Sequence, residues 1–269
     1  MPDVYPSRIV SLQPSATVTL AEAGALNRVV ACTRYCADVC PEVRTRGIAL
    51  VQDSWTAQAE QIVAAAPDLV VASVPYQIEA VAQILKAGVR FLGLAPRTLS
   101  DIYRDIAMIC GAVGLAPEGE RIVSQMEQHI DAARTRAESG ARPLVFCEEW
   151  GKPIIHSQLW VAELVEAAGG RFLGAPGKHT TAEEVLQADP DVILAAWCGA
   201  GDRVPLEKII RDRGWMETKA ARAGRVFCVA DELLNTPAHT LLGGLDAIAW
   251  ALRPELFPRP RGIRAIASY

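Results

Sequence analysis

Aromatic and thiol side chains recur where short apolar runs of the sequence end. Runs such as residues 29–32 and 192–196 are apolar throughout, which is typical of parallel strands covered on both faces. Open parallel sheets bind ligands at the carboxyl ends of their strands, so the residues after each run are candidate contacts. Tryptophan and tyrosine there offer rigid faces that suit a broad, flat, largely apolar ligand. The candidate ligand-binding residues are Pro14, Ser15, Tyr35, Cys36, Trp55, Tyr76, Trp150, Trp197, Cys198 and Asn235.

The other three tryptophans have a different setting. Trp160, Trp215 and Trp250 fall within helical patterns, and tryptophan is highly buried on average. We therefore predict that these three pack in the core.

Thiols and carboxylates also allow a catalytic interpretation. Cys147, Glu148 and Glu149 with His156 or His239 would supply a nucleophile and a base, so a cytosolic thiol-dependent enzyme is an alternative function. Nucleophile elbows, phosphate-binding loops and dinucleotide fingerprints are absent from the sequence, so we predict no catalytic residues. Cys32, Cys36 and Cys40 are spaced unlike zinc or iron–sulfur ligands, and no metal site is predicted.

Charge and cysteine content bear on partners and compartment. The 269 residues are 51% apolar and 22% charged with a net charge of −4, which excludes disorder and offers no basic surface for nucleic acid. The seven cysteines form no dense disulfide framework, and residues 1–8 do not resemble a secretory leader. These features predict a cytoplasmic protein, with a periplasmic or cell-surface location as the alternative if a leader has been removed.

An internal repeat organises the chain. Residues 59–70 match residues 182–193, and in both segments a short helix ends at Pro-Asp and a strand follows. Three weaker matches occur in the same order, so we predict an α/β fold of two similar lobes with parallel-rich central sheets. Residues 117–139 carry apolar residues at helical spacing and predict one long connector helix. The predicted domains are residues 1–115, the connector 116–139, and 140–269 with an irregular tail from about 257.

The sequence resembles the class III solute-binding proteins of ABC importers. The resemblance lies in the segments Arg8–Ser15, Thr33–Cys36 and Glu60–Val71 and in their counterparts in the second half. The arrangement is most similar to the cobalamin-binding branch of that family. The resemblance implies two lobes joined by a long helix, a ligand held between them, and no catalysis. It implies a corrinoid or related metal-bearing macrocycle as the bound ligand, with no covalent cofactor. Haem or an iron-siderophore is the alternative ligand.

A pair of glutamates occupies matching places in the repeat. Glu60 and Glu183 each precede the Pro-Asp of their segment by about seven residues. In the family that the chain resembles, one acidic residue per lobe pairs with arginines of the importer permease, so these two are candidate docking residues. The alternative is that both simply stabilise the first turn of a helix through its dipole.

Overall fold

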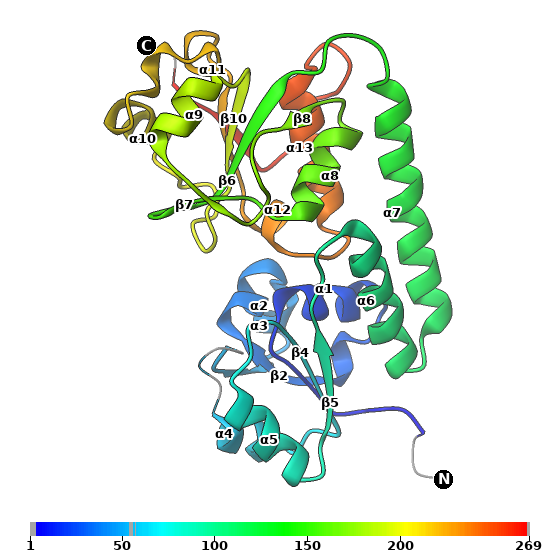
Figure 1. Ribbon diagram of the computed structural model, residues 1–269. Helices are drawn as coiled ribbons and strands as arrows, with labels where there is room; N and C mark the ends of the chain where they lie inside the picture. Colours follow the sequence, from blue (N-terminus) through cyan, green and yellow to red (C-terminus); the bar gives the residue numbers. More distant parts are fainter. Residues whose placement is uncertain (1–3, 54–55, 57, 268–269) are drawn as a thin grey trace. The chain divides into compact units, whose positions relative to one another are not determined.

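The computed structural model describes residues 4–53, 56 and 58–267 (Figure 1). The chain divides into two compact units, Met1–Gln125 and Met126–Tyr269, here called unit 1 and unit 2. The division falls inside helix α7 (Ala116–Arg136), so this one helix belongs to both units. Each unit has its own sheet and its own core.

Unit 1 is built on a parallel sheet with the strand order β3-β2-β1-β4-β5. All five residues of β4 are buried, because helices cover both faces of the sheet. The strands are β1 (Ile9–Ser11), β2 (Val29–Thr33), β3 (Ala49–Val51), β4 (Leu69–Ser73) and β5 (Arg90–Leu94).

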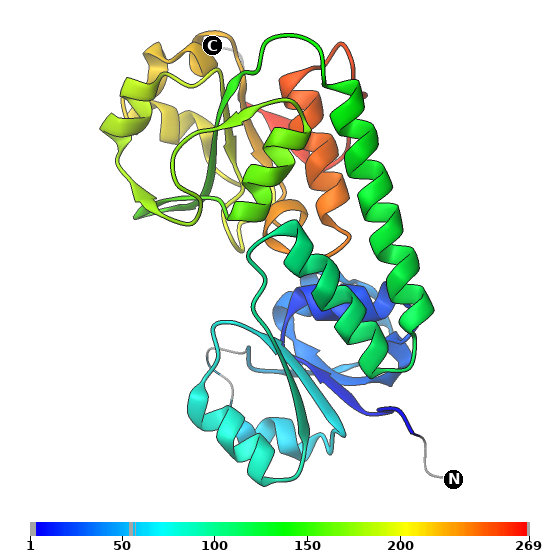
Figure 2. The ribbon, with the colours of Figure 1, turned by 45° about the vertical axis from the view of Figure 1, so that its right-hand side comes forward.

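Two groups of helices cover the sheet of unit 1. Helix α1 packs against α6, and α4 packs against α5 (Figure 2). Core residues such as Val10, Ile62 and Ile84 fill the space beneath α4 and α5. The helices are α1 (Pro14–Glu22), the 3-10 turn η1 (Leu26–Arg28), α2 (Arg34–Val39), α3 (Glu42–Thr45), α4 (Ala59–Ala64), α5 (Ile78–Lys86) and α6 (Leu99–Ala112).

The long helix α7 confirms the predicted connector, with bounds that differ by one to three residues from those expected. Its buried apolar side chains are those of Ile122, Met126, Ile130 and Ala133, which recur every three or four positions and so form one apolar stripe. Helix α7 joins the two units.

Unit 2 has a mixed sheet with the order β12-β11-β10-β6-β7-β9, and β8 pairs with β6. Strands β8, β6, β10 and β11 run parallel, whereas β12, β7 and β9 pair antiparallel with their neighbours. The strands are β6 (Leu144–Gly151), β7 (Ile154–His156), β8 (Arg171–Phe172), β9 (His179–Thr180), β10 (Val192–Ala195), β11 (Val226–Val229) and β12 (Ile263–Ala265).

Helices also flank both faces of the sheet in unit 2. Helices α8 and α13 pack together on one side, and α9, α10 and α11 lie on the other (Figure 1). The helices are α8 (Leu159–Ala167), α9 (Ala182–Ala188), α10 (Leu206–Asp212), the 3-10 turn η2 (Trp215–Glu217), α11 (Lys219–Arg222), α12 (Glu232–Asn235) and α13 (Leu241–Leu252).

The parallel cores of the two units have equivalent strand orders. In unit 1 the sequence β2-β1-β4-β5 matches β8-β6-β10-β11 in unit 2, and the repeated segments lead into β4 and β10. The predicted architecture of two similar α/β halves joined by a helix is therefore confirmed.

The carboxyl-terminal segment differs from the predicted irregular tail. Residues 263–265 form β12, which pairs antiparallel with β11. The Arg264 guanidinium donates to the carbonyl oxygen of Val204 at 2.7 Å, and this bond holds the strand in place. In the part of the chain that the structure describes, no helix is long and apolar enough to cross a membrane.

Candidate functional site

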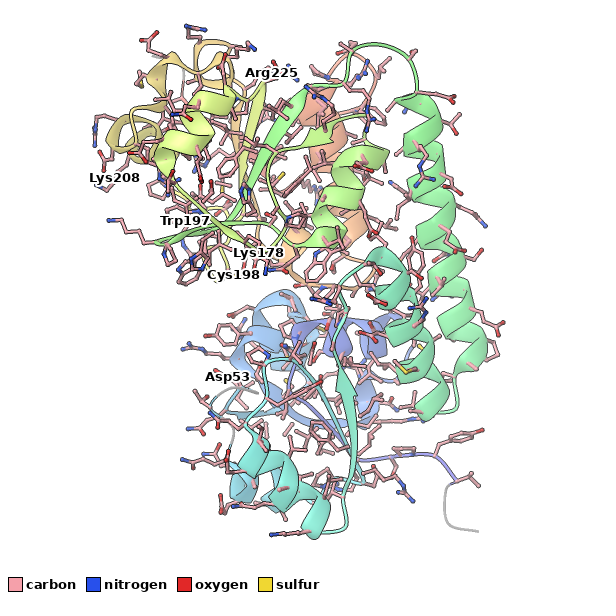
Figure 3. The ribbon with its side chains drawn as sticks, in the orientation of Figure 1. Asp53, Lys178, Trp197, Cys198, Lys208 and Arg225 are labelled. Atoms are coloured by element: carbon pink, nitrogen blue, oxygen red, sulfur yellow. The ribbon has the colours of Figure 1, made fainter. Side chains whose placement is uncertain are left out.

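In unit 2 the carboxyl ends of β6 and β10 bring two predicted contact residues, Trp150 and Trp197, to one edge of the sheet. Trp150 is 45% exposed, and its Nε1 donates to the carbonyl oxygen of Lys152 at 3.0 Å. The Trp197 indole lies so close to Gly151 that a Cβ atom there would overlap the ring. Figure 3 shows Trp197 with Cys198 and Lys178 at this edge. Two indoles are thus held at the end of one strand pair.

Beneath these indoles lies a buried ion pair between Glu148 and Arg213. The Glu148 side chain is fully buried, and both of its oxygens accept from the Arg213 guanidinium at 2.8 Å. Burial raises the pKa of Glu148, and the bonds from Arg213 oppose that shift. Arg213 also donates to the carbonyl oxygen of Gly151 at 3.0 Å, so it fixes the backbone on which Trp197 rests.

Glu149 belongs to a second polar group at the same edge. Its Oε2 accepts from Gln158 Nε2 at 2.8 Å, and the Cys198 thiol lies 3.8 Å from its Oε1. Burial raises the pKa of Glu149. Desolvation of the thiol, followed by the charges of Glu149 and Asp231, raises the pKa of Cys198.

The segment after β10 is held by hydrogen bonds from the next strand along the sheet. Asp231 follows β11, and its two carboxylate oxygens accept the backbone N–H groups of Gly199 at 2.7 Å and Gly201 at 2.9 Å. Asn235 Nδ2 donates to the carbonyl oxygen of Ala196 at 2.7 Å. Trp197 and Cys198 therefore lie in a segment anchored on both sides.

In unit 1 the corresponding candidate is a groove of about 510 Å³ at the carboxyl ends of β2 and β3. The Arg34 guanidinium lies 4.7 Å from the centre of the Tyr35 ring and donates to the Tyr35 hydroxyl at 2.6 Å. The groove combines an aromatic face with one cation, the carboxylate of Asp53 and uncharged polar groups. Its lining residues are Arg34, Tyr35, Leu50, Val51, Gln52, Asp53, Thr56 and Gln61.

The structure places three unit 1 candidates in helices. Pro14 and Ser15 follow β1 as predicted and are the first residues of α1, where proline suits the first helical turn. Cys36, expected to contact ligand, is fully buried in α2, with its sulfur 3.2 Å from the Thr33 hydroxyl oxygen. A small apolar side chain is most stable facing the core, and this one offers no surface to a ligand.

Tyr76 is half-buried and is tied to its own unit. Its hydroxyl donates to the carbonyl oxygen of Leu94, and its ring meets Phe91 edge-on with 5.7 Å between ring centres. Trp55 lies outside the described residues.

The predicted packing role of the remaining tryptophans is confirmed. Trp215 is fully buried and Trp160 nearly so, with the Trp160 Nε1 donating to the carbonyl oxygen of Leu234 at 2.8 Å. Trp250 is half-buried and packs edge-on against Phe227.

The geometry gives no support to the thiol-dependent enzyme. Cys147 lies in the middle of β6, is fully buried, and has a pKa raised by burial, so it supplies no nucleophile. Among the described residues, no group of three or more histidine, cysteine or acidic side chains is arranged to hold a metal ion.

Glu60 and Glu183 are both exposed and lie in the first turns of α4 and α9. This position satisfies the helix-start role. It also leaves both carboxylates accessible on their own units.

Sequence reasoning missed several residues that build the unit 2 site. Arg213, Gln158 and Asp231 carried no local signal, because their partners are distant in sequence. The adjacent glutamates Glu148 and Glu149 did carry a local signal. Adjacent strand residues face opposite sides of a sheet, so each of these carboxylates needs a separate partner.

Three known proteins show the relationship of this chain. The uncharacterized ABC transporter substrate-binding lipoprotein YvrC of Bacillus subtilis is 24% identical over 265 residues, covering 94% of this chain and 82% of the relative. The vitamin B12-binding protein of Vibrio cholerae is 24% identical over 261 residues, covering 91% of this chain and 89% of the relative. The solved structure of the periplasmic heme-binding protein RhuT from Roseiflexus, in its apo form, is 26% identical with a TM-score of 0.78, and the match covers 91% of this chain and 98% of that one.

A sequence model of the periplasmic binding protein family matches residues 9–233. The chain belongs to this family, in the class that serves ABC transporters, and the predicted resemblance is confirmed. The two relatives from Bacillus subtilis and Vibrio cholerae are both named as binding proteins.

The predicted cytoplasmic location is wrong. The family is one of periplasmic binding proteins, and one of the relatives is a lipoprotein. The prediction relied on seven cysteines as a sign of a reducing compartment, but six of the seven free thiols are buried. Buried cysteines behave as small apolar side chains, so their number says little about the compartment.

Proposed function

We propose that this chain captures a metal-bearing macrocycle, a corrinoid or a haem, as the substrate-binding component of an ABC importer. The observation that carries the proposal is the pair of indoles at the carboxyl ends of β6 and β10. Trp150 is 45% exposed, and Trp197 rests on Gly151, where it is backed by the buried Glu148–Arg213 ion pair. Fixed aromatic faces suit a flat macrocycle, because little conformational entropy is lost when the ligand stacks on them.

The relatives support this ligand class. Vitamin B12 is named as the ligand of the Vibrio cholerae protein, and haem as that of the Roseiflexus protein. Both ligands contain a roughly flat metal-bearing macrocycle with polar substituents at its rim.

Polar groups beside the aromatic faces would orient the ligand. In unit 1 these are Arg34 and the uncharged side chains of the Tyr35 groove, and in unit 2 they are Lys178 and Cys198. Asn235 acts through Ala196 and positions the Trp197 segment. Tyr35, Trp150 and Trp197 therefore supply stacking, and their polar neighbours supply orientation.

The experiment measures affinity for cyanocobalamin and for haemin by equilibrium dialysis, read by ligand absorbance. We expect Trp197→Ala and Trp150→Ala each to weaken binding of the preferred ligand about tenfold, since an aromatic contact contributes about 1 kcal/mol beyond its buried area. Trp250→Phe is the matched control, because it alters an indole that packs against Phe227 and lies outside the proposed site. This variant should bind the ligand with the affinity of the unmutated chain.

Gly151→Ala provides an independent test that keeps every tryptophan. The added methyl group would displace the Trp197 ring, so the affinity should fall while the fold persists. Unchanged affinity in Trp197→Ala, Trp150→Ala and Gly151→Ala together would refute the aromatic site.

Glu60 and Glu183 are the proposed contacts with the permease of the importer. Both are exposed at equivalent places in the repeat, which suits a partner with two related subunits. The double variant Glu60→Ala with Glu183→Ala should lose co-purification with the permease and keep full ligand affinity. Glu79→Ala with Glu217→Ala alters two other exposed glutamates, one in the first turn of α5 and one in the 3-10 turn η2, and should behave like the unmutated chain.

A further inference from the structure

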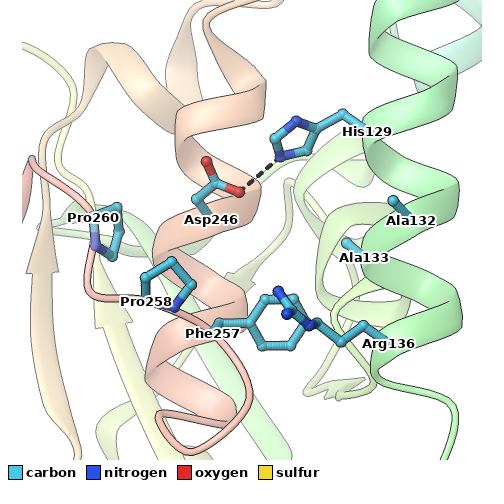
Figure 4. Close-up of a pocket in the computed structure, with 8 residues that line it drawn as sticks. All are labelled: His129, Ala132, Ala133, Arg136, Asp246, Phe257, Pro258 and Pro260. Carbon is cyan, nitrogen blue, oxygen red and sulfur yellow. Dashed lines mark hydrogen bonds and ion pairs between the residues drawn. The ribbon is translucent and has the colours of Figure 1, made fainter.

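Unit 2 contains a hollow of about 610 Å³ between helix α7, helix α13 and the segment that follows α13 (Figure 4). This volume lies within the range of small-molecule sites. The hollow is separate from the indole site, which lies at the carboxyl ends of the strands. The last residues of α13, Ala251 and Leu252, accept hydrogen bonds from Arg225 at the amino end of β11.

One wall of the hollow is apolar. Phe257 contributes an aromatic face, and Ala132 and Ala133 of α7 contribute methyl groups. Phe257 is 9% exposed, so its ring is fixed by the core of unit 2. This wall would hold the hydrocarbon part of a ligand.

Arg136, in the last turn of α7, brings a positive charge to this wall. Its guanidinium carbon lies 5.4 Å from the centre of the Phe257 ring, and Figure 4 shows the group lying over that ring. Within the described ranges Arg136 forms no ion pair with a carboxylate. A guanidinium stacked on an aromatic face keeps the N–H groups at its edge available for a planar anion.

The acidic group of the hollow is already engaged. Asp246 Oδ1 lies 2.7 Å from His129 Nε2, and the two side chains meet on the far side from Arg136 (Figure 4). His129 contacts one oxygen of that carboxylate, whereas Arg136 has no ion-pair partner among the described residues, so Arg136 is the group that we expect to meet an anionic ligand.

We propose that this hollow is a second ligand site, which binds a small organic carboxylate with an aromatic or aliphatic body. The carboxylate accepts two parallel N–H bonds from Arg136, and the body packs against Phe257 and the alanine methyl groups. A ligand bound in this way connects α7 with the segment after α13. The site does not depend on the macrocycle and adds to the proposed function.

Benzoate is the probe, and its neutral analogue benzamide has nearly the same shape without the charge. NMR titration of the full chain should show benzoate binding in the millimolar range, with shifts at the His129 ring, and about tenfold weaker binding of benzamide. Arg136→Gln should weaken benzoate binding about tenfold. Arg134→Gln is the matched control: Arg134 lies on the same helix, is exposed and pairs with Asp131, and this variant should bind as the unmutated chain does.

Three outcomes would overturn the proposal. They are no benzoate binding up to about 20 mM, equal binding of benzoate and benzamide, and equal binding by Arg136→Gln and the unmutated chain. Circular dichroism spectra of Arg136→Gln and Arg134→Gln should match the spectrum of the unmutated chain, so that affinities of folded proteins are compared.

Discussion

Ala66 and Asp189 have the same left-handed backbone conformation, with φ of 46° and 47°. They lie 123 residues apart, at equivalent places in the internal repeat, and each precedes a proline. Among the described residues no other non-glycine residue has a positive φ. The two units therefore share an uncommon turn between a helix and the next strand.

The aspartate two residues later has the same function in each unit. Asp68 accepts the backbone N–H groups of Ser7 at 2.8 Å and Arg8 at 3.0 Å, just before β1. Asp191 accepts the backbone N–H of Leu144, the first residue of β6, at 2.7 Å. The repeated Pro-Asp thus fixes the register between neighbouring strands in both sheets.

Ala66→Gly should raise the free energy of unfolding. An alanine with positive φ is strained by about 1 kcal/mol, and glycine removes that strain at a smaller entropic cost. Urea denaturation should show a gain of about 0.5 kcal/mol. The control is Ala65→Gly, because Ala65 has φ of −72° and glycine there should destabilise the protein. If the Ala66→Gly variant were no more stable than the Ala65→Gly variant, the backbone of Ala66 would not be strained.

Local sequence patterns predicted the two α/β halves and the connector, because strand, helix and turn signals lie within about 15 residues. The site residues were harder to predict. Trp150 and Trp197 were found from their places after strands, but the support from Arg213 depends on a contact with a residue 65 positions away. Cys36 was predicted to contact ligand, but the first turn of α2 directs its thiol into the core. The position of a residue in the sequence does not reveal the direction of its side chain.

Asp105 predicts a pH dependence of stability. Burial, followed by the nearby charge of Asp101, raises the pKa of Asp105 from 3.8 to about 6. The folded chain therefore binds this proton more tightly than the unfolded chain, and the free energy of unfolding falls as pH rises through this range. Asp105→Asn should be more stable than the unmutated chain at pH 7 by about 1–2 kcal/mol and equally stable near pH 4.

Asp101, in the same helix, is the control because its pKa is shifted in the opposite direction. Hydrogen bonds from Thr98 and Arg97 lower the pKa of Asp101, so its contribution to stability is present at neutral pH and lost in acid. Asp101→Asn should therefore be less stable than the unmutated chain at pH 7. Urea denaturation of both variants at the two pH values measures the contrast, and equal pH profiles would refute the assignment.

The buried ion pair between Glu148 and Arg213 should be costly to break. Arg213→Met leaves a buried carboxylate without its partner and should lower the free energy of unfolding by about 3 kcal/mol. Adding Glu148→Met should restore most of that loss, because apolar replacements remove both charges. Arg211→Met, two residues earlier in the last turn of α10, is the control, and it should cost less than about 0.5 kcal/mol because its pair with Asp212 is exposed. A loss below about 1 kcal/mol in Arg213→Met would contradict the structure.

Asp231 should affect ligand affinity through the Trp197 segment. Asp231→Ala removes the acceptors for the Gly199 and Gly201 N–H groups, so the segment loses its anchor. We expect an affinity about tenfold weaker for the macrocycle, since two charge-assisted bonds are lost. Asp202→Ala, an exposed neighbour in the same segment, should keep full affinity, and equal dialysis results for the two variants would show that Asp231 does not position the site.

Isothermal titration calorimetry of the full chain with cyanocobalamin and with haemin is the most direct test of the central claim. The predicted result is one site per chain for at least one of the two ligands, with a dissociation constant of about 1 μM or below. If the folded protein binds neither ligand at about 100 μM, it is not a macrocycle-binding protein and the central claim is contradicted.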